Sequence, residues 1–270
     1  MIPFRPLELE DKELVKKYTF VSSRRNCDLC FTNLFSWRFL YQTELAEWKG
    51  FLLFRFYVEQ ELTYMMPVGA GCLEEVLLDL QSDALHKGAT LRLAGICKDM
   101  LDIIEGIFPG KFEFTTDRDY ADYIYLRTDL ATLKGKKYQP KRNHINRFKN
   151  RYPDYVYKPL TKELIPERRS MQNVLENMDA LDIQGGVLFV EGRIVAFTYG
   201  SPINPTTFDT CVEKANADVE GAYSMINYEF ANSLPETYLY INREEDLGLE
   251  GLRKAKLSYN PDTILEKYNA

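Results

Sequence analysis

The sequence predicts an α+β fold in which two mixed-sheet units follow each other in tandem. A strand hairpin, a helix, a strand, a helix and a further strand occur in that order twice along the 270 residues. This length suits one large domain or two small ones. A strongly basic run separates the halves, so we expect an N-terminal unit at residues 1–133 and a C-terminal unit at residues 134–270.

The first half begins with two helices, which we expect at residues 11–20 and 33–41. The second is so rich in aromatic and aliphatic residues that we expect it to be buried. Gly88 and Pro109-Gly110 end two later helices. After the first two helices we expect strands at 51–58 and 62–67, a helix at 73–86, a strand at 90–96, a helix at 98–107, and strands at 112–115 and 123–126.

The second half repeats this order after a strand at 155–157 and a helix at 161–177. Its hairpin turns at Glu191-Gly192-Arg193, a combination that favours a tight turn between strands. We expect strands at 186–190, 194–200 and 207–212, a helix from Gly221, a strand at 238–242, a helix at 249–255, and a last strand within 263–268.

The run KGKKYQPKRNHINRFKNR at residues 134–151 is strongly basic, although the whole chain carries a net charge of −6. Pro140 favours a helix start, with Ile145 and Phe148 on one face. Two interpretations stay open. The run is either a solvated helix that connects the halves or a contact surface for phosphate-rich groups. In the second case the binding residues are Lys141, Arg142, Asn143, His144 and Asn146.

The composition excludes several classes of protein. Two histidines do not supply a His-rich metal site, so acid–base chemistry falls to carboxylates, tyrosine, lysine or backbone groups, and we expect no metal. Five irregularly spaced cysteines favour a reducing cytoplasm, and we interpret Cys27 and Cys30 as two small residues on one helix face. We expect no transmembrane segment, because no apolar run is long enough, and no DNA partner, because the net charge is negative.

Residues 206–231 form a strand, a polar loop and a helix that begins near Gly221. The free N–H groups and the dipole of such a helix start attract anions. Gly221 has no Cβ, so a ligand can approach its backbone closely. The alternative is that Gly221 only starts a helix in an ordinary α/β unit.

Four motifs carry a resemblance to a known family. They are KKYQPKRNHINRF, GGVLFVEGRIVAFTYG, FDTCVEKANADVEGAYSMINYEFA and INREEDLGLEGLRKAKLSYNP. They resemble the bacterial proteins related to the C-terminal domain of phosphatidylglycerol lysyltransferase, strongly from Lys134 onward and more weakly before it. That family is similar to the tandem acyl-CoA N-acyltransferase (GNAT-like) fold and to Fem-type aminoacyltransferases. It usually has a longer helical stretch before the strand at Gly186.

The resemblance implies a donor site in a cleft where two central strands splay apart. The phosphate end of the donor lies at the helix start after the fourth strand of the unit. Asp218 and Glu220 repel a pyrophosphate there, which weakens the acetyl-CoA interpretation and favours an aminoacyl-tRNA. We expect no covalently bound cofactor. The expected donor-binding residues are Val219, Gly221, Ala222, Tyr223 and Lys256.

The same resemblance suggests catalytic residues. Glu213 ends the strand that enters the cleft and is the expected proton acceptor, with Asp209 on the same strand. Period-two alternation places Asp209, Cys211 and Glu213 on one face. Tyr259 is the expected acid beside the leaving group, and Asn242 and Arg243 complete the substrate-binding residues. As alternatives, Glu213 pairs with Lys214 or a neighbouring arginine, and Tyr259 is one packed tyrosine among 18.

The resulting hypothesis is an acyl- or aminoacyltransferase that moves an activated acyl group to an amine or hydroxyl. Its donor is an aminoacyl-tRNA or an acyl-CoA, and a lipid acceptor would require peripheral contact with a membrane. The alternative is a non-catalytic module that retains the fold and binds nucleotide or RNA, such as tRNA, through residues 134–151. A structural partner protein without a small ligand is the third hypothesis.

Overall fold

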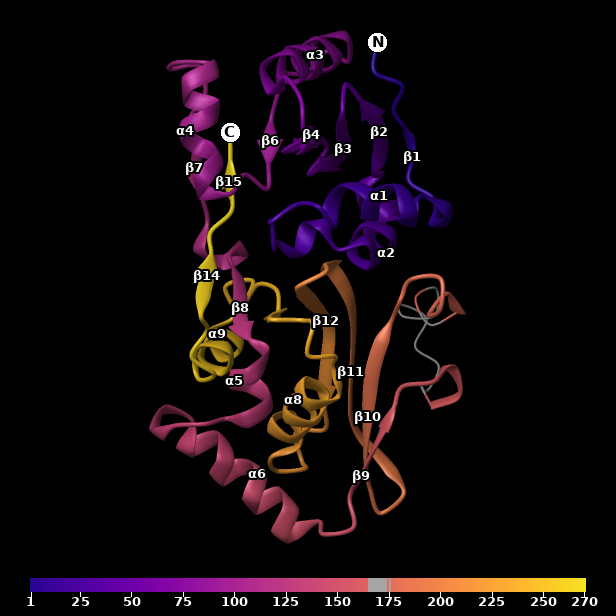
Figure 1. The fold of residues 1–270 in the computed structure, drawn as a ribbon, viewed down its shortest axis with the longest axis vertical. Coiled ribbons are helices and arrows are strands. Elements are labelled where there is room, and N and C mark those ends of the chain that lie inside the picture. The colour runs from indigo at the N-terminus through magenta and orange to yellow at the C-terminus, as the bar shows by residue number, and fades with distance from the viewer. Residues whose placement is uncertain (165–173, 175) are drawn as a thin grey trace.

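The computed structural model describes residues 1–164, 174 and 176–270 and has two mixed sheets (Figure 1). The predicted α+β fold of two mixed-sheet units is therefore confirmed. The first sheet has the order β1-β2-β3-β4-β6, and β5 pairs with β3. Its strands are β1 (Arg5–Pro6), β2 (Glu44–Trp48), β3 (Phe51–Val58), β4 (Glu61–Met65), β5 (Val68–Gly69) and β6 (Leu93–Ala94).

The second sheet has seven strands in the order β14-β8-β13-β12-β11-β10-β9. Its central pair, β12 and β13, is parallel, while the other neighbours are antiparallel. The strands are β8 (Asp122–Leu126), β9 (Val156–Pro159), β10 (Gln184–Val190), β11 (Arg193–Asn204), β12 (Thr207–Ala215), β13 (Tyr240–Asn242) and β14 (Thr263–Leu265).

The two units exchange segments. Strand β8 precedes residue 133 in the chain and yet pairs within the second sheet. The C-terminal β15 (Tyr268–Asn269) runs back to the first unit, where it pairs with β7 (Thr115–Thr116) (Figure 1). A single-residue bridge between Ile96 and Tyr268 extends this contact.

The helices cover and separate the two sheets. Helices α1 and α2 lie between the sheets (Figure 1), and their core contains Phe54 of β3 together with Val187 of β10. The helices are α1 (Lys12–Thr19), α2 (Phe31–Tyr41), α3 (Leu73–His86), α4 (Lys98–Ile107), α5 (Arg127–Thr132), α6 (Gln139–Arg151), α8 (Ala222–Ser233) and α9 (Glu250–Leu257). Short 3₁₀ turns occur at Leu9–Asp11, Cys27–Leu29, Arg118–Tyr120, Lys136–Tyr138 and Lys162–Leu164.

Most local predictions are confirmed. Helices α3 and α4 have the predicted bounds, and α6 has Pro140 in its first turn with Ile145 and Phe148 buried. Of the strand predicted at 90–96, only β6 (Leu93–Ala94) forms, because only these two residues pair with β4. The helix predicted at 161–177 lies mostly outside the described residues, and its first part is a 3₁₀ turn.

The prediction that the second helix is buried is wrong for its C-terminal half. Phe31, Leu34 and Phe35 share one face and are buried between the sheets. Trp37, Phe39 and Leu40 are 55%, 71% and 64% exposed. A helix that is apolar all round can bury only the face that meets the core, and the rest of α2 projects beyond it.

Candidate functional site

The two central strands of the second sheet part, as the family resemblance implies. Strands β12 and β13 pair over three residues each and separate after Asp209 and Asn242. Strand β12 then continues to Ala215 along β11, while β13 ends. Helix α8 follows β12 and packs against β10, β11 and β12. The opening between the two strands is the first element of the candidate site.

A β-bulge in β12 sets the direction of its side chains. Two residues between Asp209 and Val212 face a single residue of β11, Gly200. A Cβ at Gly200 would lie 1.7 Å from the Asp209 carbonyl oxygen, so this close approach requires glycine. The extra residue reverses the alternation. Asp209 therefore contacts α2 while Glu213 contacts α8, and the prediction that both share a face is wrong.

Glu213 and Arg243 form an ion pair across the parting strands. Arg243 follows β13 directly, and its Nη2 donates a hydrogen bond to Glu213 Oε1 at 2.7 Å. Asn227 Nδ2 of α8 donates to the second carboxylate oxygen at 3.1 Å. The side chain of Glu213 is 12% exposed and that of Arg243 is 10% exposed. The neighbouring-arginine alternative for Glu213 is thus what the structure shows.

Lys141 and Tyr259 lie against this ion pair. The Lys141 Nζ is 3.8 Å from the centroid of the Tyr259 ring, and the Arg243 guanidinium carbon is 4.8 Å from it. Burial, together with the charge of Arg243, lowers the pKa of Lys141 to about 8, although Glu213 opposes the shift. Burial raises the pKa of Tyr259, so its hydroxyl stays protonated at neutral pH. Ser224 of α8 hydrogen-bonds to Tyr259.

Two polar atoms at this point are buried without a partner in the described part of the chain. They are Arg243 Nη1, a donor, and Asn227 Oδ1, an acceptor. Unpaired buried polar atoms cost free energy and mark places where a ligand or water completes the bonding. We call the set Lys141, Glu213, Asn227, Arg243 and Tyr259 the wedge site. A separate cleft of about 500 Å³ lies at the edge of the first sheet.

The start of helix α8 is covered by α6. Gly221 has a φ of +86°, and a Cβ there would lie 3.1 Å from the His144 carbonyl oxygen and from Phe148 Cβ. The glycine therefore allows two helices, rather than a helix and a ligand, to approach. The N–H of Ala222 bonds to the Val219 carbonyl. Ala222 is buried and Val219 half-buried, while Tyr223 is exposed.

The predicted phosphate-binding residues of α6 contact different parts of the structure. Arg142 donates to the carbonyls of Leu133 and Gly135 and so holds the loop before α6. Asn143 accepts a hydrogen bond from Gln139. His144 and Asn146 are exposed, and only Lys141 reaches the wedge site.

Asn242 and Lys256 position the segment that carries Arg243. Asn242 is fully buried, donates to the Arg25 carbonyl and to Asp122, and accepts from the Glu244 N–H. Lys256 Nζ donates to the carbonyl of Arg243 at 2.5 Å and to the carbonyl of Glu245. Both side chains hydrogen-bond to other groups of the protein. Their role is therefore to hold Arg243 in position.

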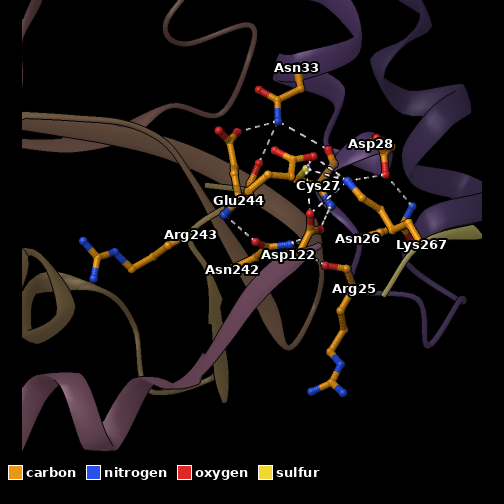
Figure 2. Close-up of polar contacts among 12 residues, drawn as sticks. Arg25, Asn26, Cys27, Asp28, Asn33, Asp122, Asn242, Arg243, Glu244 and Lys267 are labelled. Atoms are coloured by element: carbon orange, nitrogen blue, oxygen red, sulfur yellow. Dashed lines mark hydrogen bonds and ion pairs between the residues drawn. The ribbon is translucent and has the colours of Figure 1, made fainter. Parts of the chain in front are cut away.

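Asp209 belongs to a second polar cluster at the start of α2, which includes Asn33 and Glu244 (Figure 2). Asn33 Nδ2 donates to Asp209 at 2.9 Å, to Glu244 at 2.8 Å and to the Cys27 carbonyl at 3.3 Å. Burial raises the pKa of Asp209 well above its usual range and that of Glu244 to about 8. Asp209 therefore does not join Glu213 in one catalytic pair.

Lys267 sits in a neighbouring cluster of acids (Figure 2). Its Nζ lies 2.5 Å from Glu245, 2.9 Å from Asp122 and 3.2 Å from Asp28. Cys27 Sγ lies 3.4 Å from Asp122 and 3.3 Å from Glu245. Cys27 is in a 3₁₀ turn and contacts these acids, whereas Cys30 precedes α2 and contacts Ser201 and Cys211. The prediction of one shared helix face is therefore wrong.

The sequence-based reasoning missed Asn227 and Ser224 at the wedge site. Both are polar residues three positions apart on the otherwise apolar face of α8, and that pattern is the signal that indicates them. It also missed Asn33 and Lys267. Nothing in the local sequence connects these two residues to acids more than 100 positions away.

The family profile described as phosphatidylglycerol lysyltransferase, C-terminal, matches residues 19–270. The chain belongs to this family. A crystal structure of a conserved protein of unknown function from Bacteroides thetaiotaomicron is 53% identical and aligns with a TM-score of 0.96, over 100% of this chain and 99% of that one. The C-terminal DUF2156 domain of a candidate lysylphosphatidylglycerol synthetase from Agrobacterium fabrum is 14% identical and aligns with a TM-score of 0.67, over 96% and 91%.

Another relative is the uncharacterised protein MYCGA3080 of Mycoplasmoides gallisepticum. It is 24% identical over an alignment of 172 residues, and the match covers 54% of this chain and 54% of that protein. The match thus spans about half the length of that curated relative. Among the helices described here, none is both long and apolar enough to cross a bilayer.

Proposed function

We propose that this protein transfers an activated aminoacyl or acyl group to an amine or hydroxyl at the wedge site. Its membership of the lysyltransferase C-terminal family supports this proposal. The observation that carries it is the Glu213–Arg243 pair at the parting of β12 and β13, with Arg243 Nη1 and Asn227 Oδ1 unpaired. The guanidinium of Arg243 can donate a hydrogen bond and the amide oxygen of Asn227 can accept one. Because both groups are largely desolvated, they suit the carbonyl and the amino group of an aminoacyl ester.

Each group at the wedge site has a role in acyl transfer. Arg243 Nη1 donates to the donor's carbonyl oxygen, which becomes negative as the nucleophile attacks, and Asn227 Oδ1 accepts from the donor's amino group. Lys141, with its pKa near 8, takes the proton of the attacking amine or hydroxyl. The new bond forms at the carbonyl carbon, the bond to the leaving group breaks, and Tyr259 protonates the departing atom. Glu213 becomes a positioning residue.

We favour an aminoacyl-tRNA over an acyl-CoA as the donor. The start of α8, where a pyrophosphate would bind, is covered by α6 and flanked by the exposed acids Asp218 and Glu220. Helix α6 exposes Arg147 and Arg151, which meet Glu220 only at 3.6 and 3.8 Å. Loosely paired arginines on an exposed helix suit the phosphates of an RNA backbone.

The same basic face of α6 supports the non-catalytic alternative, in which the protein binds RNA without transferring anything. A lipid acceptor also stays a proposal, together with peripheral membrane contact. The exposed Trp37, Phe39 and Leu40 of α2 are suitable apolar groups for such contact. The cytoplasmic location stays a prediction.

The proposal is tested with purified protein, radiolabelled aminoacyl-tRNAs and labelled acetyl-CoA. The acceptors are phosphatidylglycerol vesicles and soluble amines. We expect transfer from an aminoacyl-tRNA, loss of that transfer in Lys141→Met, and unchanged transfer in the exposed control Lys87→Met. Retained RNA binding without transfer would favour the alternative, and neither binding nor transfer with both donors would contradict the proposal.

A further inference from the structure

We propose that Cys30, Asp209 and Cys211 form a binding site for a thiophilic divalent cation such as Zn²⁺. The inference is independent of the proposed transfer activity. The three residues come from two elements that lie far apart in the chain. Cys30 precedes α2, while Asp209 precedes the bulge of β12 and Cys211 lies in it. One ligand atom from each residue lies within 4.8 Å of the other two.

The separations of these atoms suit a tetrahedral ion. The Cys30 and Cys211 Sγ atoms are 3.9 Å apart, and the Asp209 Oδ2 is 3.7 Å from Cys211 Sγ. With Zn–S bonds of about 2.3 Å and Zn–O bonds of about 2.1 Å, tetrahedral angles place two sulfurs about 3.8 Å apart and a sulfur and an oxygen about 3.6 Å apart. The site therefore needs little rearrangement, and its three protein ligands leave one of the four tetrahedral positions for another ligand.

Neighbouring groups orient the three ligands. Ser201 Oγ lies 3.1 Å from Cys30 Sγ and donates to Thr32 Oγ1. Asn33 Nδ2 donates to Asp209 Oδ2. Hydrogen bonds of this kind to the coordinating side chains are a regular feature of metal sites. Asp209 is fully buried, and its Oδ1 has no partner within the described residues, so the carboxylate retains bonding capacity for a ligand.

The neighbouring cluster around Cys27 contains a cation of the chain, whereas the cluster of Cys30, Asp209 and Cys211 has none among the described residues. There Cys27, Asp122 and Glu245 surround the Lys267 ammonium at 2.5 to 3.7 Å, so the chain supplies its own cation. Around Cys30, Asp209 and Cys211, the described contacts are to hydroxyl, amide and thiol groups and include no cation. A metal ion would displace the protons of these groups and supply the positive charge that two buried thiolates and a carboxylate require.

The experiment measures metal binding on the full chain, purified without a polyhistidine tag or chelator under reducing conditions. We expect stoichiometric zinc by mass spectrometry. With Co²⁺ in the apo protein, we expect visible bands of tetrahedral cobalt and a sulfur-to-cobalt charge-transfer band. The double variant Cys30→Ser/Cys211→Ser loses the charge-transfer band, and Asp209→Asn weakens Co²⁺ affinity roughly tenfold or more. Cys27→Ser, a matched buried thiol, keeps wild-type binding.

A second readout uses only the wild-type protein, in case a variant fails to fold. Removing the metal with EDTA should speed thiol labelling of Cys30 and Cys211 and leave the exposed Cys72 unchanged. Labelling that does not change would contradict the site. So would wild-type protein with neither bound metal nor cobalt bands, a charge-transfer band that survives the double substitution, or a native Cys30–Cys211 disulfide.

Discussion

Replacing Glu213 by glutamine tests whether the ion pair at the wedge site is a desolvated pair that fixes Arg243. The two side chains are about nine-tenths buried, and their charged atoms are 2.7 Å apart. Glutamine has the same shape but leaves the guanidinium without a counter-ion. Breaking a buried pair costs about 3–5 kcal/mol, and we expect about 3 kcal/mol because the amide oxygen still accepts a hydrogen bond.

That loss of unfolding free energy corresponds to a Tm lower by roughly 6–12 °C for a chain of this size. The measurement is urea and thermal unfolding followed by far-ultraviolet circular dichroism at neutral pH. Glu250→Gln is the matched control, because Glu250 pairs with Lys254 on the exposed face of α9 and should lose less than about 0.5 kcal/mol. The double variant Glu213→Gln/Arg243→Met should recover to within about 1 kcal/mol of the wild type, because no charge is left buried alone.

Two outcomes would refute this reasoning. A Glu213→Gln variant that loses no more stability than the Glu250→Gln control would show that the pair is not desolvated. A double variant that is less stable than Glu213→Gln would show that Arg243 contributes packing rather than a buried charge. In either case Glu213 would not be the residue that positions Arg243.

Two further predictions concern the surrounding structure. Lys267→Met removes the cation that lowers the pKa values of Asp28 and Asp122, so burial should hold both pKa values above those of the unfolded chain. The folded variant then binds more protons than the unfolded one, so its stability relative to wild type should rise from about pH 7 to about pH 5, and denaturation curves that stay parallel would contradict this. Gly200→Ala drives a Cβ into the Asp209 carbonyl and should destabilise the protein, whereas Gly251→Ala in α9 has free space and should stabilise it by up to about 1 kcal/mol; equal effects in thermal unfolding would argue against the bulge.

Elements with strong local signals were predictable. Helix α3 ends before Gly88, α4 stops before Pro109, and α6 has Pro140 in its first turn, because each signal acts through its own backbone. The apolar composition of α2 indicated a helix but not which face is buried, since that depends on the length of α2 relative to the two sheets. Local patterns therefore predict elements better than they predict exposure.

The candidate site was predictable in its members more than in its roles. Lys141, Glu213, Arg243 and Tyr259 were all named from the sequence, and the structure brings them together. The direction of Glu213 depends on the bulge opposite Gly200, which reverses the strand alternation and leaves no local signature. The contacts of Asp209 with α2 span 176 residues and depend on the docking of the two units.

The most direct test of the proposed function is the pH dependence of aminoacyl transfer by the wild type and by Lys141→Arg, with phosphatidylglycerol vesicles and soluble amines as acceptors. If neutral Lys141 accepts the nucleophile's proton, the wild-type rate should rise with pH and level off above about pH 8, since burial lowers the pKa of Lys141 to that value. The arginine variant keeps the charge but does not release its proton, so its rate should be low at every pH. A variant as active as the wild type, with the same pH profile, would contradict the mechanism at the wedge site.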